Sequence, residues 1–264
     1  MQTSTLPAEL ADRARAEVAD LLDLQLSPLG LTAIDALDLQ PGQTVLDIGC
    51  GAGQTLLQIA DRVGPAGSVI GIDIAPHVLD VARTRTSSIA HVRLMQADAA
   101  TLTLPDETAD RVFSRFGVMA IAEPIAAFAN FRRMTKRGGR LGFVCWRSLE
   151  ENELDLVPLQ AAGLETSVDR TPFKFERRDY LADTLHAAGW LEIDIRAFDA
   201  SVSSGDIDAM TTVLTRVGAL GQILRGNPEL YPAAEASVRA ALRAKMRDAE
   251  VSLTAAYWNV TATA

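Results

Sequence analysis

The fold is decided by the stretch Val45-Leu46-Asp47-Ile48-Gly49-Cys50-Gly51-Ala52-Gly53. An apolar strand runs directly into three alternate glycines, and an apolar helix, Gln54 to Val63, follows them. Glycine lets the backbone turn tightly and approach a ligand closely, and the start of a helix offers free N–H groups. This order of elements predicts a binding site for a nucleotide-type cofactor.

The glycine spacing narrows the choice of cofactor. A dinucleotide fingerprint has the pattern G-x-G-x-x-G, whereas Gly49 and Gly51 are followed by Gly53, and Gln54 stands where the third glycine of that pattern would fall. Asp47 adds a carboxylate at the end of the strand, which would repel a pyrophosphate and attract an ammonium or a sulfonium. The stretch therefore favours a cationic ligand over a dinucleotide.

Four further segments follow in a regular order. They are Val69 to Asp73, His91 to Gln96 with Ala97-Asp98-Ala99 after it, Ala109 to Ser114 with Arg115 after it, and the basic, glycine-rich turn Lys136 to Leu141 before a fifth strand. Strands and helices alternate up to residue 146, which is typical of a parallel sheet covered on both faces. In such a sheet the loops that follow the strands meet at one edge, where ligands bind.

These motifs resemble those of the class I S-adenosylmethionine-dependent methyltransferases over about residues 30 to 200. The chain is most similar to the small-molecule branch that includes quinone-biosynthesis methyltransferases. The resemblance implies an α/β, Rossmann-like, doubly wound seven-stranded sheet of order 3-2-1-4-5-7-6, with strand 7 antiparallel and helical cap elements. It also implies S-adenosyl-L-methionine as cofactor and S-adenosyl-L-homocysteine as product.

The resemblance assigns roles to the acids after the strands. In this family the acid at the position of Asp73 binds the two ribose hydroxyls, and Asp98 resembles the acid that binds adenine. One acid alone would be better explained as a helix or turn cap, but three acids in register with the glycine loop favour cofactor binding. The predicted cofactor-binding residues are Asp47, Gly49, Cys50, Gly51, Gly53, Gln54, Thr55, Asp73, Ile74, Ala97, Asp98, Ala99, Ser114 and Arg115.

The implied reaction is in-line displacement at the sulfonium methyl by an O-, N- or C-nucleophile of a small-molecule acceptor. Alignment of the two reactants can supply about 7 to 11 kcal/mol in the best model systems, so the reaction depends mainly on proximity. No catalytic base can be assigned, because the three histidines, His77, His91 and His186, are better explained as structural or exposed. The candidates for the acceptor rim are Arg115, Trp146 and Arg147, directly after strands 4 and 5.

The chain is expected to form a single methyltransferase domain over residues 1–264. Its parts are an N-terminal helical cap (1–43), a cofactor-binding core (44–146), a rim insertion (147–176) and a segment that completes the sheet (177–264) and carries a helical lid (206–247). The cap is expected to contain two helices that meet at Ser27-Pro28, and the lid to contain helices 206–224 and 232–247. A dimerisation surface or a plain cover for the sheet is the alternative for the lid.

Charge and composition bear on the partners. The net charge is −9, which argues against a nucleic-acid substrate because phosphate contacts require a basic face. No apolar run is long enough for a membrane span and the first residues do not resemble a signal peptide, so a cytoplasmic protein without membrane insertion is expected. A homodimer is left open. No metal is predicted, since Cys50 and Cys145 have no second ligand at metal-site spacing.

Two other classes of function compete with a methyltransferase. A non-catalytic S-adenosylmethionine-binding or assembly protein would keep the same fold without an assignable base. A nicotinamide oxidoreductase would also use a strand, a glycine loop and an acid, but the glycine spacing differs and no Tyr-x-x-x-Lys pair is present.

Overall fold

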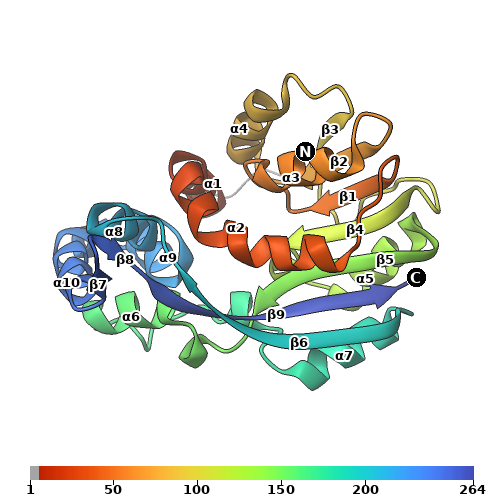
Figure 1. Ribbon diagram of the computed structural model, residues 1–264. Coiled ribbons are helices and arrows are strands. Elements are labelled where there is room, and N and C mark those ends of the chain that lie inside the picture. The colour runs from red at the N-terminus through yellow and green to blue at the C-terminus, as the bar shows by residue number, and fades with distance from the viewer. Residues whose placement is uncertain (1–5) are drawn as a thin grey trace. The chain divides into compact units, whose positions relative to one another are not determined.

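Seven strands form one sheet in the order β3-β2-β1-β4-β5-β9-β6 (Figure 1). The computed structural model describes residues 6–264, so residues 1–5 of the predicted N-terminal cap lie outside the described residues. The strands are β1 Thr44–Ile48, β2 Ser68–Asp73, β3 Val92–Gln96, β4 Ala109–Arg115, β5 Thr135–Trp146, β6 Leu191–Val202 and β9 Leu253–Thr263. Neighbours among β1 to β5 are parallel, and β9 pairs with β5 in the antiparallel direction. The predicted fold class and strand order are confirmed.

The chain divides into two units. The sheet unit consists of Leu29–Arg147, Thr171–Phe198 and Tyr257–Ala264. The helical unit consists of Ser148–Arg170, Asp199–Ala256 and the described part of Met1–Pro28. Segments that are far apart in the sequence therefore fold together in both units.

The helices of the sheet unit include α3 Gln54–Val63, whose bounds are those that the sequence predicts. The others are α4 Pro76–Thr86, α5 Pro124–Met134 and α7 Arg178–Ala187, with the second half of α2 Ala19–Ala36. Proline stands at the first position of α4 and of α5, where its missing N–H costs no hydrogen bond. In α3 the buried residues Leu56, Ile59 and Val63 recur at helical spacing, so one face of α3 packs inward.

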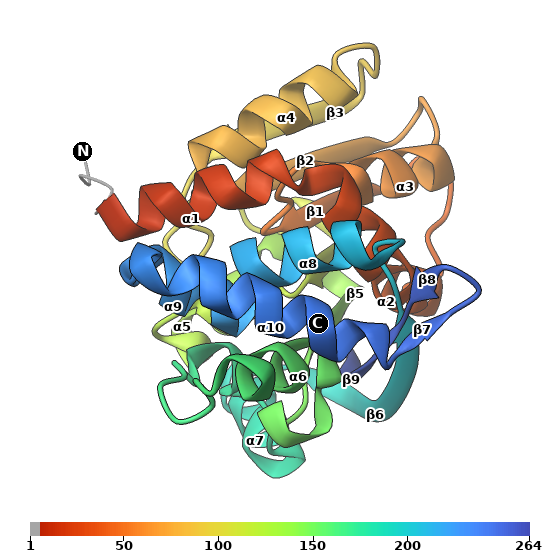
Figure 2. The ribbon, with the colours of Figure 1, turned by 90° about the vertical axis from the view of Figure 1, so that its left-hand side faces the viewer.

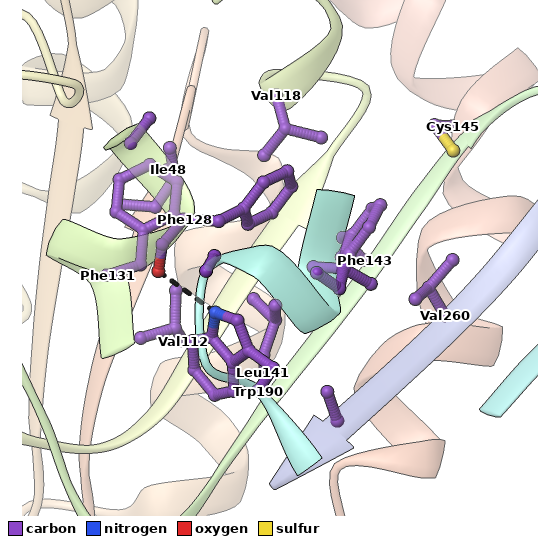
Figure 3. Packing of buried hydrophobic residues seen from close by; sticks show 14 of the residues in the cluster. Ile48, Val112, Val118, Phe128, Phe131, Leu141, Phe143, Cys145, Trp190 and Val260 are labelled. Carbon is purple, nitrogen blue, oxygen red and sulfur yellow. Dashed lines mark hydrogen bonds between the residues drawn. The ribbon is translucent and has the colours of Figure 1, made fainter. Parts of the chain in front are cut away.

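The core of the sheet unit is built around aromatic side chains from α5 and β5 (Figure 3). Phe128 packs edge-on against Phe131 and at a tilt against Phe143, with ring centroids 5.7 and 5.5 Å away. Trp190 is fully buried, and its indole N–H donates to the carbonyl oxygen of Phe128 at 2.9 Å. This bond fixes the start of β6 to α5 and satisfies the only polar group of the indole.

The helical unit contains α1 Leu6–Glu17, α6 Glu153–Ala162, α8 Ile207–Arg216, α9 Gly218–Gly226 and α10 Tyr231–Arg243, and these helices are labelled in Figure 2. A two-stranded hairpin, β7 Met246–Arg247 and β8 Glu250–Val251, follows α10. The Asn152 amide donates to the backbone oxygen of Ala256 at 3.0 Å and accepts from its N–H at 2.8 Å. Buried Asn152 thus binds α6 to the last strand as a backbone group would.

The N-terminal helices differ from the prediction. Their boundary falls at Val18, and Pro28 lies inside α2 instead of starting a helix. The residues after Pro28 explain this: Leu29, Ala33 and Ile34 are fully buried. Their burial offsets the one backbone hydrogen bond that the proline removes.

Three other elements differ from the expected pattern. The glycine-rich turn lies within β5, because the strand already starts at Thr135 and Gly138 adopts a left-handed φ of 71°. The predicted helix 206–224 is broken at Val217, where Gly218 has φ 68°, and the helix expected at 232–247 ends at Arg243 before the hairpin. Left-handed glycines therefore account for two of these irregularities.

Among residues 6–264, no helix combines the length and the apolar character that a membrane crossing requires.

Candidate functional site

The glycine loop lies across the end of β2. The backbone N–H groups of Gly49 and Cys50 both donate to the carbonyl oxygen of Ile72, at 2.8 and 3.1 Å. Gly49, Gly51 and Gly53 have left-handed φ angles of 72°, 52° and 84°, which other residues rarely adopt. The loop conformation therefore requires the alternate glycines of the sequence motif.

The three glycines differ in what surrounds them. A Cβ on Gly49 would lie 2.7 Å from the Cα of Gly117, and one on Gly53 would lie 2.9 Å from the Cβ of Ala82. A Cβ on Gly51 would meet no atom within 4 Å. Gly49 and Gly53 thus allow close packing inside the protein, whereas Gly51 faces open space in which a ligand can approach the backbone.

Asp73 holds the glycine loop and the next turn together. Its Oδ2 accepts from the N–H of Gly51 and its Oδ1 accepts from the N–H of Ala75, both at 2.9 Å. An ionised carboxylate offers about four lone-pair sites, so two remain for a ligand. The next side chain, Ile74, is 58% exposed and supplies an apolar surface beside this acid.

Asp98 lies two residues after β3, whose last residue, Gln96, pairs with Asp73. The N–H of Ala97 donates to the backbone oxygen of Asp73 at 3.0 Å, which brings the two strand ends together. The exposed Asp98 side chain accepts from the N–H of Ala100 at 2.9 Å, and Ala99 is half-buried in this turn. Asp98 therefore closes a local turn through one carboxylate oxygen.

Asp47 is the most unusual acid of the site. It is fully buried, and the hydroxyl of Thr55 donates to its Oδ2 at 2.5 Å. Its Oδ1 has no hydrogen-bond partner among the described residues. Burial raises the pKa of Asp47 to about 7, and the Asp73 carboxylate adds to this, against the lowering effects of the Thr55 hydrogen bond and the Arg115 charge. A buried, unpartnered carboxylate oxygen fits a cationic ligand group.

Arg115, at the end of β4, is oriented toward the glycine loop. Its guanidinium donates to the side-chain oxygen of Gln54, in the first turn of α3, at 2.5 Å. Its aliphatic part passes over Gly30 of α2, where a Cβ would lie 2.8 Å from Arg115 Cδ. Arg115 thus connects the predicted cofactor residues with α2.

The hydroxyl of the neighbouring residue, Ser114, makes hydrogen bonds to the protein backbone. Ser114 is fully buried, donates to the carbonyl oxygen of Ile48 at 2.7 Å and accepts from the N–H of Gly117 at 3.1 Å. It holds the loop after β4 against the end of β1. Its contribution to a cofactor site is therefore to shape the loop.

An aromatic cluster lies at the ends of β4 and β5. The rings of Phe116 and Trp146 stack at a centroid distance of 3.8 Å and an angle of 23°. Phe116 has a left-handed φ of 60°, which is strained for a bulky residue. Trp146 donates its backbone N–H to the sulfur of Met119 at 3.3 Å, and the Arg147 guanidinium lies 5.5 Å from the ring centre of Trp258.

Tyr257 of β9 is opposite Trp146 in the antiparallel pair. Burial raises the pKa of Tyr257, and its hydroxyl contacts that of Thr32 at 3.5 Å. Phe116 and Tyr257 both lie beside Trp146, a predicted rim residue, and the sequence analysis did not single them out. The position of Phe116 next to Arg115 is a signal that could have identified it, whereas Tyr257 depends on a strand register that no local motif specifies.

The histidines lie on separate elements. His91 precedes β3, with a ring nitrogen 3.3 Å from the carbonyl oxygen of Ala60, and His186 is in the last turn of α7. His77 is in the first turn of α4. In the described part of the chain, no group of three or more His, Cys, Asp or Glu side chains is arranged to hold a metal ion.

Comparison with known proteins agrees with this geometry. Residues 45–139, which include the glycine loop, Asp73 and Asp98, match the family model described as a methyltransferase domain. This part of the chain is thus similar to a methyltransferase domain, and the resemblance drawn from the sequence is confirmed.

Two curated relatives and one solved structure illustrate the similarity. The aklanonic acid methyltransferase of Streptomyces sp. (strain C5) is 34% identical over 44% of this chain and 54% of its own length. The demethylmenaquinone methyltransferase of Staphylococcus carnosus is 24% identical over 64% of this chain and 76% of its own. The crystal structure of the YcgJ protein from Bacillus subtilis matches with a TM-score of 0.61, 18% identity and coverage of 89% and 97%, and so shows the shared fold.

Alignments with two of the curated relatives cover only 36% and 54% of those proteins. The chain thus spans about half or less of the length of these relatives.

Proposed function

We propose that the protein transfers a methyl group from S-adenosylmethionine to a small-molecule acceptor. The observation that carries this proposal is the arrangement of the glycine loop between two acids. Buried Asp47 has an unpartnered oxygen, Gly51 leaves its backbone open to a ligand, and Asp73 keeps two lone-pair sites beyond those that hold the loop.

The residues of the site fit the parts of this cofactor. Asp47 would hold the ammonium group, and the start of α3, with Gln54 and Thr55, would hold the carboxylate through the free N–H groups there. Asp73 would accept from the ribose hydroxyls, and exposed Ile74 would pack against the adenine near Asp98. When bound, S-adenosylmethionine supplies an electrophilic methyl group on its sulfonium.

The acceptor would be bound at the ends of β4 and β5. The stacked rings of Phe116 and Trp146 offer an apolar surface there, and Arg115 and Arg147 offer positive charge. These side chains would align an acceptor nucleophile and exclude water. Alignment of the two reactants supplies much of the rate enhancement in such displacements. The proposed mechanism therefore does not require a general base.

We further propose that residues 206–247 form a lid that takes part in acceptor recognition, as the sequence predicts. The predicted lid lies in the helical unit, which also contains Ser148–Arg170 of the predicted insertion and the described residues of the predicted cap up to Pro28. Hydrogen exchange of residues 206–247 tests this part. Protection that increases when S-adenosylhomocysteine and acceptor are added supports a lid, and protection that is the same with and without them contradicts it.

A screen of acceptors tests the proposed activity. The protein is incubated with S-adenosylmethionine and a panel of phenols, quinols, amines and carboxylic acids, and mass spectrometry looks for products heavier by one CH2 group. Such a product together with S-adenosylhomocysteine is expected. Cofactor binding without any product would favour the non-catalytic binding protein, and binding of NAD in its place would favour the oxidoreductase.

A further inference from the structure

Asp47 is a buried acid with one carboxyl oxygen that has no hydrogen-bond donor among the described residues. Its side chain is 0% exposed and receives one hydrogen bond, from Thr55 to Oδ2, while Oδ1 has no partner among the described residues. An ionised carboxylate in such a place has lost its hydration and gained little in return. The neutral, protonated form is therefore favoured until a cation arrives.

The charged and titratable groups around Asp47 do not remove this preference. The charge of Arg115 lowers the pKa of Asp47 by less than burial raises it, and the Arg115 guanidinium donates its hydrogen bond to Gln54. Asp73 acts in the opposite direction through charge repulsion. Burial, with the charges of Asp47 and Asp73, raises the pKa of the Cys50 thiol, so that Cys50 stays neutral. Among the described residues, none donates a hydrogen bond to Oδ1 of Asp47.

We propose that Asp47 is protonated in the free protein below neutral pH and gives up this proton when the α-ammonium group of S-adenosylmethionine or S-adenosylhomocysteine binds beside it. The O–H bond of the carboxyl group breaks, the proton passes to the buffer, and a carboxylate–ammonium ion pair forms. Nothing is oxidised or reduced. This inference rests on the proposed function, because it requires that this cofactor bind at the glycine loop.

The pKa of Asp47 sets how strongly cofactor binding is coupled to proton release. With a pKa of about 7, Asp47 is protonated in roughly nine of ten free molecules one pH unit lower and in about one of ten one unit higher. Binding at about pH 6 should therefore release close to one proton, and binding at about pH 8 only about a tenth of one. Cofactor affinity should be about tenfold weaker at the lower pH, since each binding event must first ionise Asp47.

Isothermal titration calorimetry with S-adenosylhomocysteine measures this release directly. Titrations at about pH 6 are carried out in phosphate and in imidazole, and those at about pH 8 in phosphate and in Tris. The two buffers of each pair differ in ionisation enthalpy, so the difference in heat gives the number of protons released. The matched control is Asp47→Asn, which keeps the shape of the side chain and cannot ionise. Ionisation of the ligand's own amino group contributes with both proteins. The difference in proton release between wild type and Asp47→Asn is therefore the contribution of Asp47.

The expected result is release of close to one proton by the wild type at about pH 6 and its loss in Asp47→Asn. Equal release by both proteins, with clear binding, would overturn the inference and leave the proposed function standing. No binding of S-adenosylhomocysteine or S-adenosylmethionine by the folded wild type would overturn both. Should Asp47→Asn fail to fold, Thr55→Val serves as the test variant. The Thr55 hydroxyl lowers the pKa of Asp47, so its loss should extend proton release to higher pH. An unchanged dependence of proton release on pH would contradict the inference.

Discussion

The backbone N–H of Gly51 donates to Oδ2 of Asp73 at 2.9 Å, so one carboxylate both ends β2 and holds the glycine loop. Asp73 also accepts from the N–H of Ala75 at the start of α4. The resemblance assigns ribose binding to this acid, and we propose that Asp73 has both that role and the structural one.

This double role predicts the behaviour of Asp73→Ala. The variant should bind S-adenosylhomocysteine more weakly by about 1.5 to 3 kcal/mol, the usual scale for hydrogen bonds to a charged group, and should lose about 1 kcal/mol of stability with the two backbone bonds. Calorimetry and thermal unfolding measure the two effects. Asp80→Ala is the control, because Asp80 is an exposed residue of α4 that pairs with Arg83. Unchanged affinity in Asp73→Ala would show that this acid is only a cap.

The pKa of Asp47 predicts how the stability of the free protein changes with pH. Because the folded-state pKa of about 7 lies above the ordinary value of 3.8, the folded state binds more protons than the unfolded state between these pH values. The contribution of Asp47 to the free energy of unfolding therefore falls as pH rises from about 4 to 7 and stays low above 7. The full penalty is on the order of 4 kcal/mol.

Asp47→Asn removes this penalty. The variant should be more stable than the wild type at about pH 8, by up to a few kcal/mol, and the difference should shrink toward pH 4. Urea unfolding of both proteins without ligand across this range measures it. A wild type that gains stability relative to the variant as pH rises would contradict the assignment of a raised pKa.

The glycines of the loop should respond differently to alanine. Gly51→Ala places its Cβ in open space at φ 52°, so it should cost about 1 to 2 kcal/mol of stability and strongly weaken cofactor binding. Gly49→Ala places its Cβ 2.7 Å from the backbone of Gly117 and should destabilise the fold more. Thermal unfolding and titration with S-adenosylhomocysteine separate the two outcomes, and normal affinity in Gly51→Ala would argue against a ligand at this glycine.

Alanine variants of Trp146 and Arg115 should differ in whether they weaken cofactor binding. Trp146 stacks on Phe116 at the end of β5, so Trp146→Ala should lower turnover with the acceptor found by screening by about tenfold or more while S-adenosylhomocysteine still binds. Arg115 donates to Gln54 at the start of α3, so Arg115→Ala should weaken cofactor binding as well. Steady-state kinetics together with calorimetry make the comparison. If both variants lose cofactor affinity equally, Trp146 does not belong to an acceptor rim.

The strands and glycine loop could be predicted because their causes are local. Runs such as Val45 to Ile48 pack on both faces of a sheet, and three alternate glycines admit few backbone conformations. α3 extends from Gln54 to Val63 as predicted. α4 starts at Pro76, because a proline at the first helical position loses no hydrogen bond. The order of the strands follows from the resemblance to a known family, not from these local patterns.

The parts that could not be predicted depend on contacts between distant segments. Pro28 lies within α2 because the burial of Leu29, Ala33 and Ile34 after it favours the helix. Tyr257 pairs with Trp146 because of a register set by the whole sheet. The unpartnered oxygen of Asp47 is also a tertiary property. The sequence shows an acid before the glycines, but only the packing around it raises its pKa.

The central claim is that the glycine loop binds S-adenosylmethionine, and calorimetric titration of the wild-type protein with S-adenosylmethionine, S-adenosylhomocysteine and NAD tests it most directly. The account predicts binding of the first two at one site, accompanied by about 2.7 kcal/mol of stabilisation at one hundred times the dissociation constant. NAD should give no heat of binding. Binding of NAD alone, with neither S-adenosyl compound bound, would contradict the account.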